Sequence, residues 1–141
     1  MLKGISPILS PELLKLLCEM GHGDEIVLAD SNFPGVSVGR RVARADGLPI
    51  ATLLAAILPL FPLDTYDPPL IMMQVVPGDP VDPAVEADYI QVVRHFNPAA
   101  ASPVRVERFA FYERARGAFA VLMTGETRVY GNLILKKGVI K

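Results

Sequence analysis

The sequence predicts an α/β fold, a layered domain with a largely parallel central sheet flanked by helices. Segments with the apolar pattern of strands alternate along the chain with segments that have the pattern of helices, which is the order that builds a parallel sheet. The segment EIVLA (25–29) is continuously apolar after its first residue, as expected for a strand covered on both faces. At 141 residues, of which 51% are hydrophobic, the chain is long enough for one domain with its own core, expected to span residues 1–141.

The first helix is expected to begin at Pro11. Ser10 can cap it, Glu12 favours the positive end of the helix dipole, and Gly21 is expected to end it in a left-handed conformation. Cys18 lies inside the apolar pattern of this helix and is interpreted as a small core residue. Apolar residues at helical spacing indicate one buried face, formed by Leu13, Leu16, Leu17 and Met20.

The later elements alternate strand and helix and end on two strands. After a loop over 30–35, we expect strands within 40–45, 70–76, 104–108 and, around the turn TGET (124–127), within 119–138. We expect helices within 48–63, beginning near Pro49, and at 84–96 and 109–118. The helix at 84–96 is expected to bury one face, formed by Val85, Tyr89, Val92, Val93 and Phe96.

Composition limits the partners and the location of the protein. With 14 basic and 15 acidic residues the net charge is −1, so nothing favours nucleic acid or an anionic membrane. The longest uncharged run, 48–63, is shorter than the ~20 residues of a membrane span and contains three prolines. We therefore expect a cytoplasmic protein, and the lone cysteine, Cys18, fits a reducing compartment. The high apolar fraction predicts a homo-oligomer that buries part of its surface between copies.

No common nucleotide or metal motif is present. The chain contains no Walker loop, no GxGxxG and no GxSxG, so a nucleotide-dependent enzyme or a covalent serine enzyme is not expected. The acidic residues and histidines His22, Asp24, Glu25 and His95 lack the spacing of metal ligands, so we expect no metal.

His22 and Asp30 are the first candidate functional residues. His22 stands between two glycines in GHGD (21–24), where it could complement a helix end or, since glycines allow close approach of a ligand, transfer protons. Asp30 follows the buried strand 25–29, either as a cap for the next loop or as a ligand group at the carboxyl end of a sheet. A strand between them places the two residues more than ~10 Å apart, so we expect the site to form between subunits.

A second group of candidates comes from the C-terminal third. Arg108 ends the alternating strand 104–108, and YGN (130–132) interrupts the last strand with a glycine, which predicts a bulge that re-aims Tyr130 and Asn132. Together these residues supply planar donors, a phenol and an amide, groups that suit the hydroxyls of a sugar. Ordinary polarity at a strand edge is the alternative.

With these stretches assembled, the sequence resembles the family of ribose pyranases and fucose mutarotases, and within it the fucose mutarotase branch. The matching segments cover most of the chain, although 77–103 matches nothing and could form part of a pocket wall. They are SPELLKLLCEMGHGDEIVLAD (10–30), NFP (32–34), RADG (44–47), RFAFYERA (108–115), TGET (124–127) and YGNLILKKGV (130–139).

This resemblance implies a sugar mutarotase domain, an isomerase that interconverts the α and β anomers of L-fucose without cofactor or metal. It implies that His22 transfers protons and that Asp30, Arg108 and the residues Tyr130, Gly131 and Asn132 contact the sugar, Tyr130 being a possible second proton-transfer group. It also implies a ring-shaped decamer with sites between neighbouring subunits. Two alternatives stay open: a pyranase that interconverts pyranose and furanose forms of ribose-like sugars, and a sugar-binding protein without catalysis.

Overall fold

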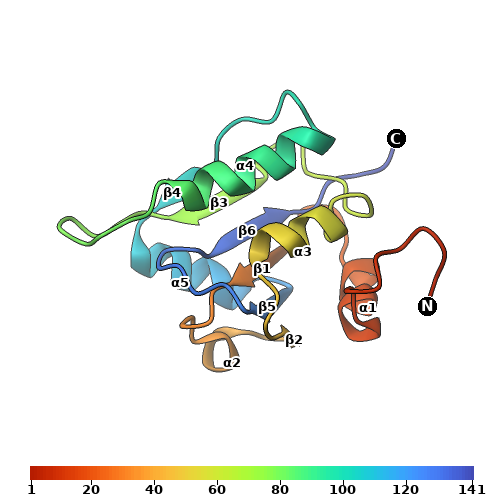
Figure 1. The fold of residues 1–141 in the computed structure, drawn as a ribbon, viewed down its shortest axis with the longest axis horizontal. Coiled ribbons are helices and arrows are strands. Elements are labelled where there is room, and N and C mark those ends of the chain that lie inside the picture. Colours follow the sequence, from red (N-terminus) through yellow and green to blue (C-terminus); the bar gives the residue numbers. More distant parts are fainter.

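The computed structural model describes residues 1–141 and contains one six-stranded sheet in the order β2-β5-β1-β6-β3-β4 (Figure 1). Strands β1 and β5, β2 and β5, and β3 and β4 pair in parallel, whereas β6 runs antiparallel to both of its neighbours, β1 and β3. The prediction of an α/β fold with a largely parallel sheet is confirmed. The strands are β1 (Glu25–Ala29), β2 (Val42–Ala45), β3 (Leu70–Met73), β4 (Val104–Val106), β5 (Ala120–Thr124) and β6 (Leu133–Lys136).

The antiparallel direction of β6 follows from the short connection before it. A parallel return needs a crossover of about a dozen residues or more, usually with a helix, but only residues 125–132 separate β5 from β6. The chain therefore turns back and enters the sheet between β1 and β3 in the opposite direction.

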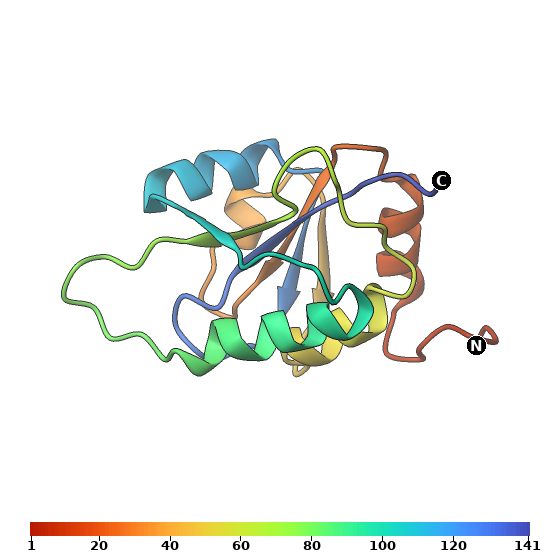
Figure 2. The same cartoon turned by 90° about the horizontal axis from the view of Figure 1, so that it is seen from above.

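Helices cover both faces of the sheet, and Figure 2 shows the strands between α5 on one side and α3 and α4 on the other. Ile26 and Leu28 of β1 pack with the cluster that contains residues of α1, α3 and α4. Val27 and Ala29 point to the opposite face, where they pack with residues of α2 and α5. The continuous apolar run of β1 is thus explained by burial on both faces. The helices are α1 (Pro11–Glu19), α2 (Gly35–Val38), α3 (Ile50–Ile57), α4 (Ala84–Phe96) and α5 (Arg108–Gly117).

No helix has the length and hydrophobicity that a membrane span requires.

Two predictions at the first helix are wrong. The helix ends at Glu19, and it is Gly23, with φ of 85°, rather than Gly21 that adopts a left-handed conformation. The turn closes because the Gly21 amide donates to the Asp24 carboxylate at 2.7 Å and the Gly23 amide donates to the Lys137 carbonyl at 2.8 Å. Cys18 is exposed rather than buried, because it lies two residues from Leu16, a step of about 200° that turns it away from the core face.

Several expected boundaries also shift. The strand expected over 70–76 ends at Met73, and the short helix α2 was not expected. Phe96, at the end of α4, is 42% exposed instead of buried. Arg108 does not end a strand: β4 stops at Val106, and Arg108 is the first residue of α5, which Glu107 caps by accepting hydrogen bonds from the amides of Phe109 and Ala110.

The segment YGN forms no bulge inside a strand. Strand β6 begins at Leu133, so residues 130–132 belong to the turn that precedes it. Tyr130 is the only non-glycine residue with positive φ, at 57°. The turn, rather than a bulge, directs the side chains of Tyr130 and Asn132.

The packing of Gly125 provides a test of this fold. A Cβ atom at Gly125 would lie 2.6 Å from the backbone carbonyl carbon of Gly47, whose own φ is 81°. We expect Gly125→Ala to lower the free energy of unfolding by about 1–3 kcal/mol, because two backbone segments would have to separate. Gly117→Ala is the matched control, since nothing lies within 4 Å of its added Cβ atom. The control is expected to be neutral or up to about 1 kcal/mol more stable. Equal stability of the two variants in urea denaturation would contradict the described packing.

Candidate functional site

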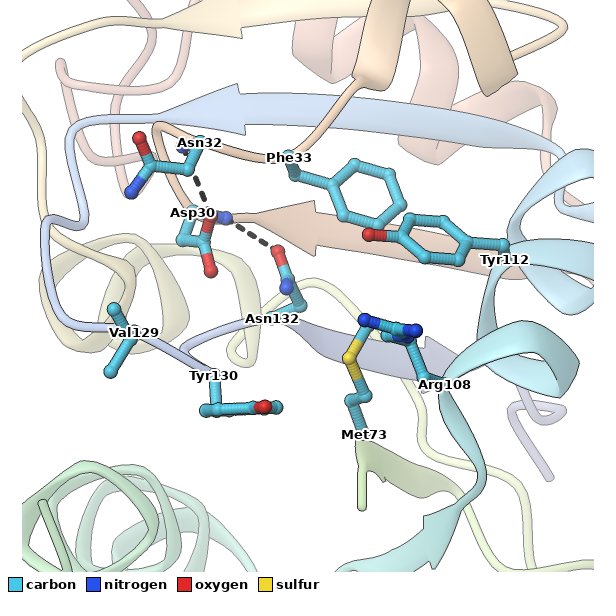
Figure 3. A pocket seen from close by; sticks show the side chains of 9 residues that line it. All are labelled: Asp30, Asn32, Phe33, Met73, Arg108, Tyr112, Val129, Tyr130 and Asn132. Carbon is cyan, nitrogen blue, oxygen red and sulfur yellow. Dashed lines mark hydrogen bonds between the residues drawn. The ribbon is translucent and has the colours of Figure 1, made fainter. Parts of the chain in front are cut away.

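A pocket of about 230 Å³ lies where the carboxyl ends of β1 and β3 meet the start of β6 (Figure 3). Ligand groups gather at this edge in open α/β sheets. The volume is below the range of pockets for drug-sized ligands, which indicates a small ligand. Nine residues line it, namely Asp30, Asn32, Phe33, Met73, Arg108, Tyr112, Val129, Tyr130 and Asn132.

The structure brings together four of the residues singled out in the sequence, Asp30, Arg108, Tyr130 and Asn132. Gly131 lies between two of these residues, and its carbonyl turns away from solvent to accept a hydrogen bond from Tyr89 at 2.7 Å. His22 is not among the lining residues. It precedes β1 whereas Asp30 follows it, so one chain leaves the histidine and the pocket at opposite ends of the strand.

Asp30 is the buried carboxylate of the pocket, only 4% exposed. Its Oδ1 atom accepts from the Asn32 amide at 3.0 Å, and its own amide donates to Oδ1 of Asn132 at 2.8 Å (Figure 3). Burial raises the pKa of Asp30, and nearby backbone amides, that of Asn32 foremost, only partly oppose this effect. A carboxylate fixed in this way accepts strong hydrogen bonds from the hydroxyl groups of a ligand.

Aromatic rings form the opposite wall. Phe33 stacks on Tyr112 with ring centroids 5.5 Å apart and an interplanar angle of 23° (Figure 3). Tyr112 follows Arg108 by four residues on α5, so the two side chains share one face of the helix. Five lining residues were not predicted as such from the sequence: Asn32, Phe33, Met73, Tyr112 and Val129. The helical spacing from Arg108 could have identified Tyr112.

Tyr130 reaches into the pocket from a backbone conformation that few side chains adopt. Its hydroxyl donates to Asp79 and accepts from the Val76 amide at 3.3 Å. The hydrogen bond to Asp79 is the main reason that the pKa of Tyr130 lies above its ordinary value. Tyr130 is therefore a neutral phenol at physiological pH, linked to a loop that no sequence motif had marked.

His22 has a different partner, Asp64, which sequence reasoning did not identify. Nε2 of His22 lies 3.2 Å from Oδ1 of Asp64, and the imidazole is 45% exposed while the carboxylate is buried. Since a carboxylate only accepts, Nε2 donates and the neutral ring presents Nδ1 as an acceptor. The ring of Tyr66 lies 5.4 Å from the imidazole. His22 is thus oriented and still open to solvent, as a group that exchanges protons requires.

Asp64 is held ionised by its surroundings. Burial alone would raise its pKa, but hydrogen bonds from the amides of Tyr66, Asp67 and Thr65 and from the His22 ring outweigh burial and place the pKa below the ordinary value. Across the chain, no group of three or more His, Cys, Asp or Glu side chains is arranged to hold a metal ion.

Comparison with known proteins places this architecture in a family. The sequence profile of the RbsD / FucU transport protein family matches residues 3–140. The chain belongs to this family. The resemblance drawn from the sequence motifs is thereby confirmed.

Relatives within the family are similar over their whole length. An L-fucose mutarotase of Histophilus somni (strain 2336) is 56% identical over 140 residues, which cover 99% of this chain and 97% of the relative. The crystal structure of a fucose mutarotase from Streptococcus pneumoniae in complex with L-fucose has a TM-score of 0.94 at 45% identity, covering 99% of this chain and all of that one. FucU from Bifidobacterium longum has a TM-score of 0.93 at 48% identity, with coverage of 99% and 100%. The family fold is therefore present from end to end.

The depressed pKa of Asp64 predicts how stability depends on pH. Because the folded pKa lies below that of an unfolded aspartate, about 3.9, the carboxylate stabilises the folded state above that pH and loses this contribution as the pH falls through the folded value. We expect Asp64→Asn to be less stable than the unsubstituted protein near neutral pH, and the difference to shrink below a pH of about 4.

Urea denaturation at several pH values measures this difference. Asp46→Asn is the control, because that carboxylate pairs with Arg44 in solvent, where an ion pair adds little. A deficit of Asp64→Asn that stays the same from neutral to acidic pH would contradict the assignment.

Proposed function

We propose that this chain is an L-fucose mutarotase, an isomerase that interconverts the α and β anomers by opening and closing the sugar ring. The convergence of Asp30, Arg108, Tyr130 and Asn132 on one small pocket carries the proposal, because these groups match the hydroxyls of a monosaccharide. The names of the relatives at 56% and 45% identity support fucose rather than a ribose-like sugar. The pyranase alternative has no specific observation in its favour.

The chemistry requires only proton transfers. In the opening step, the anomeric hydroxyl loses its proton, the ring oxygen gains one, and the bond between the anomeric carbon and the ring oxygen breaks to give an aldehyde. Rotation about the adjacent carbon–carbon bond lets the hydroxyl add back to the other face. The reaction also proceeds unaided in water, so one positioned acid–base group that contributes about 10²–10⁴-fold is sufficient. No cofactor or metal is needed for these steps.

The polar groups of the site divide the work between proton transfer and sugar binding in this proposal. His22, whose Nε2–H group donates a hydrogen bond to Asp64 and whose Nδ1 is free, transfers protons. Asp30 and Arg108 orient the sugar, and Asn132 binds a hydroxyl, while Gly131 positions its two neighbours. Tyr130 binds a hydroxyl or acts as a second proton-transfer group.

A complete site requires a second copy of the chain in this proposal. His22 and the pocket lie at opposite ends of β1, so His22 of one subunit serves the pocket of its neighbour. The resemblance to the family extends this arrangement to a decamer with a site at each contact between subunits. A cytoplasmic location agrees with the exposed free thiol of Cys18, which persists in a reducing compartment.

Saturation-transfer proton NMR on L-fucose at equilibrium tests the activity directly. One anomeric proton is saturated and the signal of the other is followed. We expect enhanced transfer with the unsubstituted protein and loss of the enhancement by about 10²-fold or more with His22→Asn. His95→Asn, at the only other histidine, is the control and should retain the enhancement.

The same spectra separate the alternatives. Enhanced exchange between pyranose and furanose forms of D-ribose, without enhancement on L-fucose, would indicate a pyranase. Line broadening by bound fucose without exchange in any variant would indicate a binding protein. An enhancement that persists in assembled His22→Asn would refute the role of His22.

Complementation between two inactive variants tests the shared site. His22→Asn and Arg108→Ala chains are unfolded together, mixed in equal amounts and refolded. Since a site takes its histidine from one chain and its pocket from another, about a quarter of the sites in random assemblies regain both groups and about a quarter of the rate returns.

Asp30→Asn mixed with Arg108→Ala is the matched control. Both substitutions lie in the pocket of a single chain, so no mixed assembly contains an intact pocket. Failure of the first pair to recover activity, with mixed assembly verified by mass spectrometry, would place the complete site within one chain.

A further inference from the structure

Helix α4 contributes a buried polar group that the proposed mechanism does not use. It lies within 77–103, the stretch to which the resemblance in sequence motifs did not extend. Tyr89 is 1% exposed, and its hydroxyl donates to the Gly131 carbonyl at 2.7 Å. Burial first, and then the neighbouring Glu126 carboxylate, raise the pKa of Tyr89 above its ordinary value, so the hydroxyl keeps its proton and remains a donor.

An ionic cluster lies next to the Tyr89 hydroxyl, on the side away from the pocket. Oε2 of Glu126, a residue only 3% exposed, lies 3.4 Å from the hydroxyl. Arg128 donates to Oε1 of Glu126 at 2.9 Å and to Asp88 at 2.6 Å, so it neutralises the buried carboxylate. The guanidinium of Arg128 also lies 6.0 Å from the centre of the Tyr89 ring. The hydroxyl is therefore fixed in position before any ligand binds.

The acceptor of this hydrogen bond lies between two residues of the pocket. Gly131 separates Tyr130, which has a positive φ of 57°, from Asn132. The space around Gly131 is closed, since an added Cβ atom would lie 2.8 Å from the Arg128 carbonyl oxygen and 3.3 Å from the Tyr89 hydroxyl. An unfavourable backbone conformation persists only where its surroundings determine it. The Tyr89 hydroxyl is a buried group that fixes the residue directly after Tyr130.

The same turn is tied to the end of β1. The Ser31 amide donates to the Glu126 carbonyl at 2.8 Å, and the Thr124 hydroxyl donates to the Ala29 carbonyl at 2.7 Å. The orientation of the turn and the orientation of Asp30 therefore depend on one connected set of hydrogen bonds.

We propose that Tyr89 is a positioning residue for sugar binding: its hydroxyl fixes the Gly131 carbonyl and thereby directs Tyr130 and Asn132 toward the sugar. Tyr89 is not one of the residues that line the pocket, so it acts through the turn that contains Gly131. The inference rests on the proposed function, because it concerns the affinity of the same site. It gives the segment 77–103 a role in recognition as well as in packing.

Tyr89→Phe removes the hydroxyl and keeps the ring, so it tests the inference with little disturbance of the core. Loss of one positioning hydrogen bond is expected to raise the dissociation constant for L-fucose about tenfold. The exchange rate at saturating fucose should stay within about threefold, because His22 is oriented by Asp64 at the other end of β1. Isothermal titration calorimetry measures the dissociation constant, with each substitution also made in a His22→Asn background that does not turn over.

Val93→Ala separates positioning from stability. Val93 is fully buried one turn further along α4 and packs in the apolar core, so its truncation destabilises the helix without contact to the turn. We expect Val93→Ala to bind L-fucose as the unsubstituted protein does. Should Tyr89→Phe fail to fold, Glu126→Gln weakens the same cluster while keeping its shape, and it should also raise the dissociation constant.

The outcomes distinguish the two proposals. An unchanged dissociation constant in Tyr89→Phe, or an equal increase in Val93→Ala, overturns the positioning role and leaves the proposed function intact. Absence of fucose binding by the unsubstituted protein overturns both.

Discussion

The register between β1 and β6 is the constraint on which the pocket depends. Leu28 pairs with Leu133 in an antiparallel ladder, so the residues that follow β1 meet the residues that precede β6. The Asp30 amide then donates to the Asn132 side chain, and the carboxylate and the amide face one cavity. A shift of β6 by one residue relative to β1 would turn the side chains of β6 to the opposite face of the sheet and separate these groups. Binding chemistry thus follows from strand pairing.

Much of the architecture was predictable from local patterns. The apolar run of β1, the spacing in α1 and α4 and the alternation of elements identify a covered, largely parallel sheet, because burial on two faces leaves a direct mark on the sequence. The same reasoning failed at Cys18 and Gly21. Being surrounded by apolar residues did not bury Cys18, since its angular position on the helix faces solvent. A hydrogen bond from the Gly21 amide to Asp24 moved the left-handed turn to Gly23.

Only some residues of the candidate site were predictable, because several of them contact partners that are far away in the sequence. Asp30 was recognisable because it directly follows a strand with a clear pattern, whereas Arg108 was singled out as the end of a strand and in fact begins helix α5. The partner of His22, Asp64, lies 42 residues away and carries no local signal. The turn at Tyr130 resembled an interrupted strand, since neighbouring apolar residues do not reveal a positive φ. Interactions between remote segments are set by the fold, and they decide which polar groups converge.

The placement of His22 and the pocket at opposite ends of one strand determines when the protein can be active. Under the proposed function, a newly made or dissociated chain is inert, and activity per chain falls on dilution below the concentration at which subunits associate. Every subunit supplies one proton-transfer group and one recognition pocket, so the two are always present in equal numbers. Quality control is intrinsic to such an arrangement, since a chain that cannot assemble cannot catalyse.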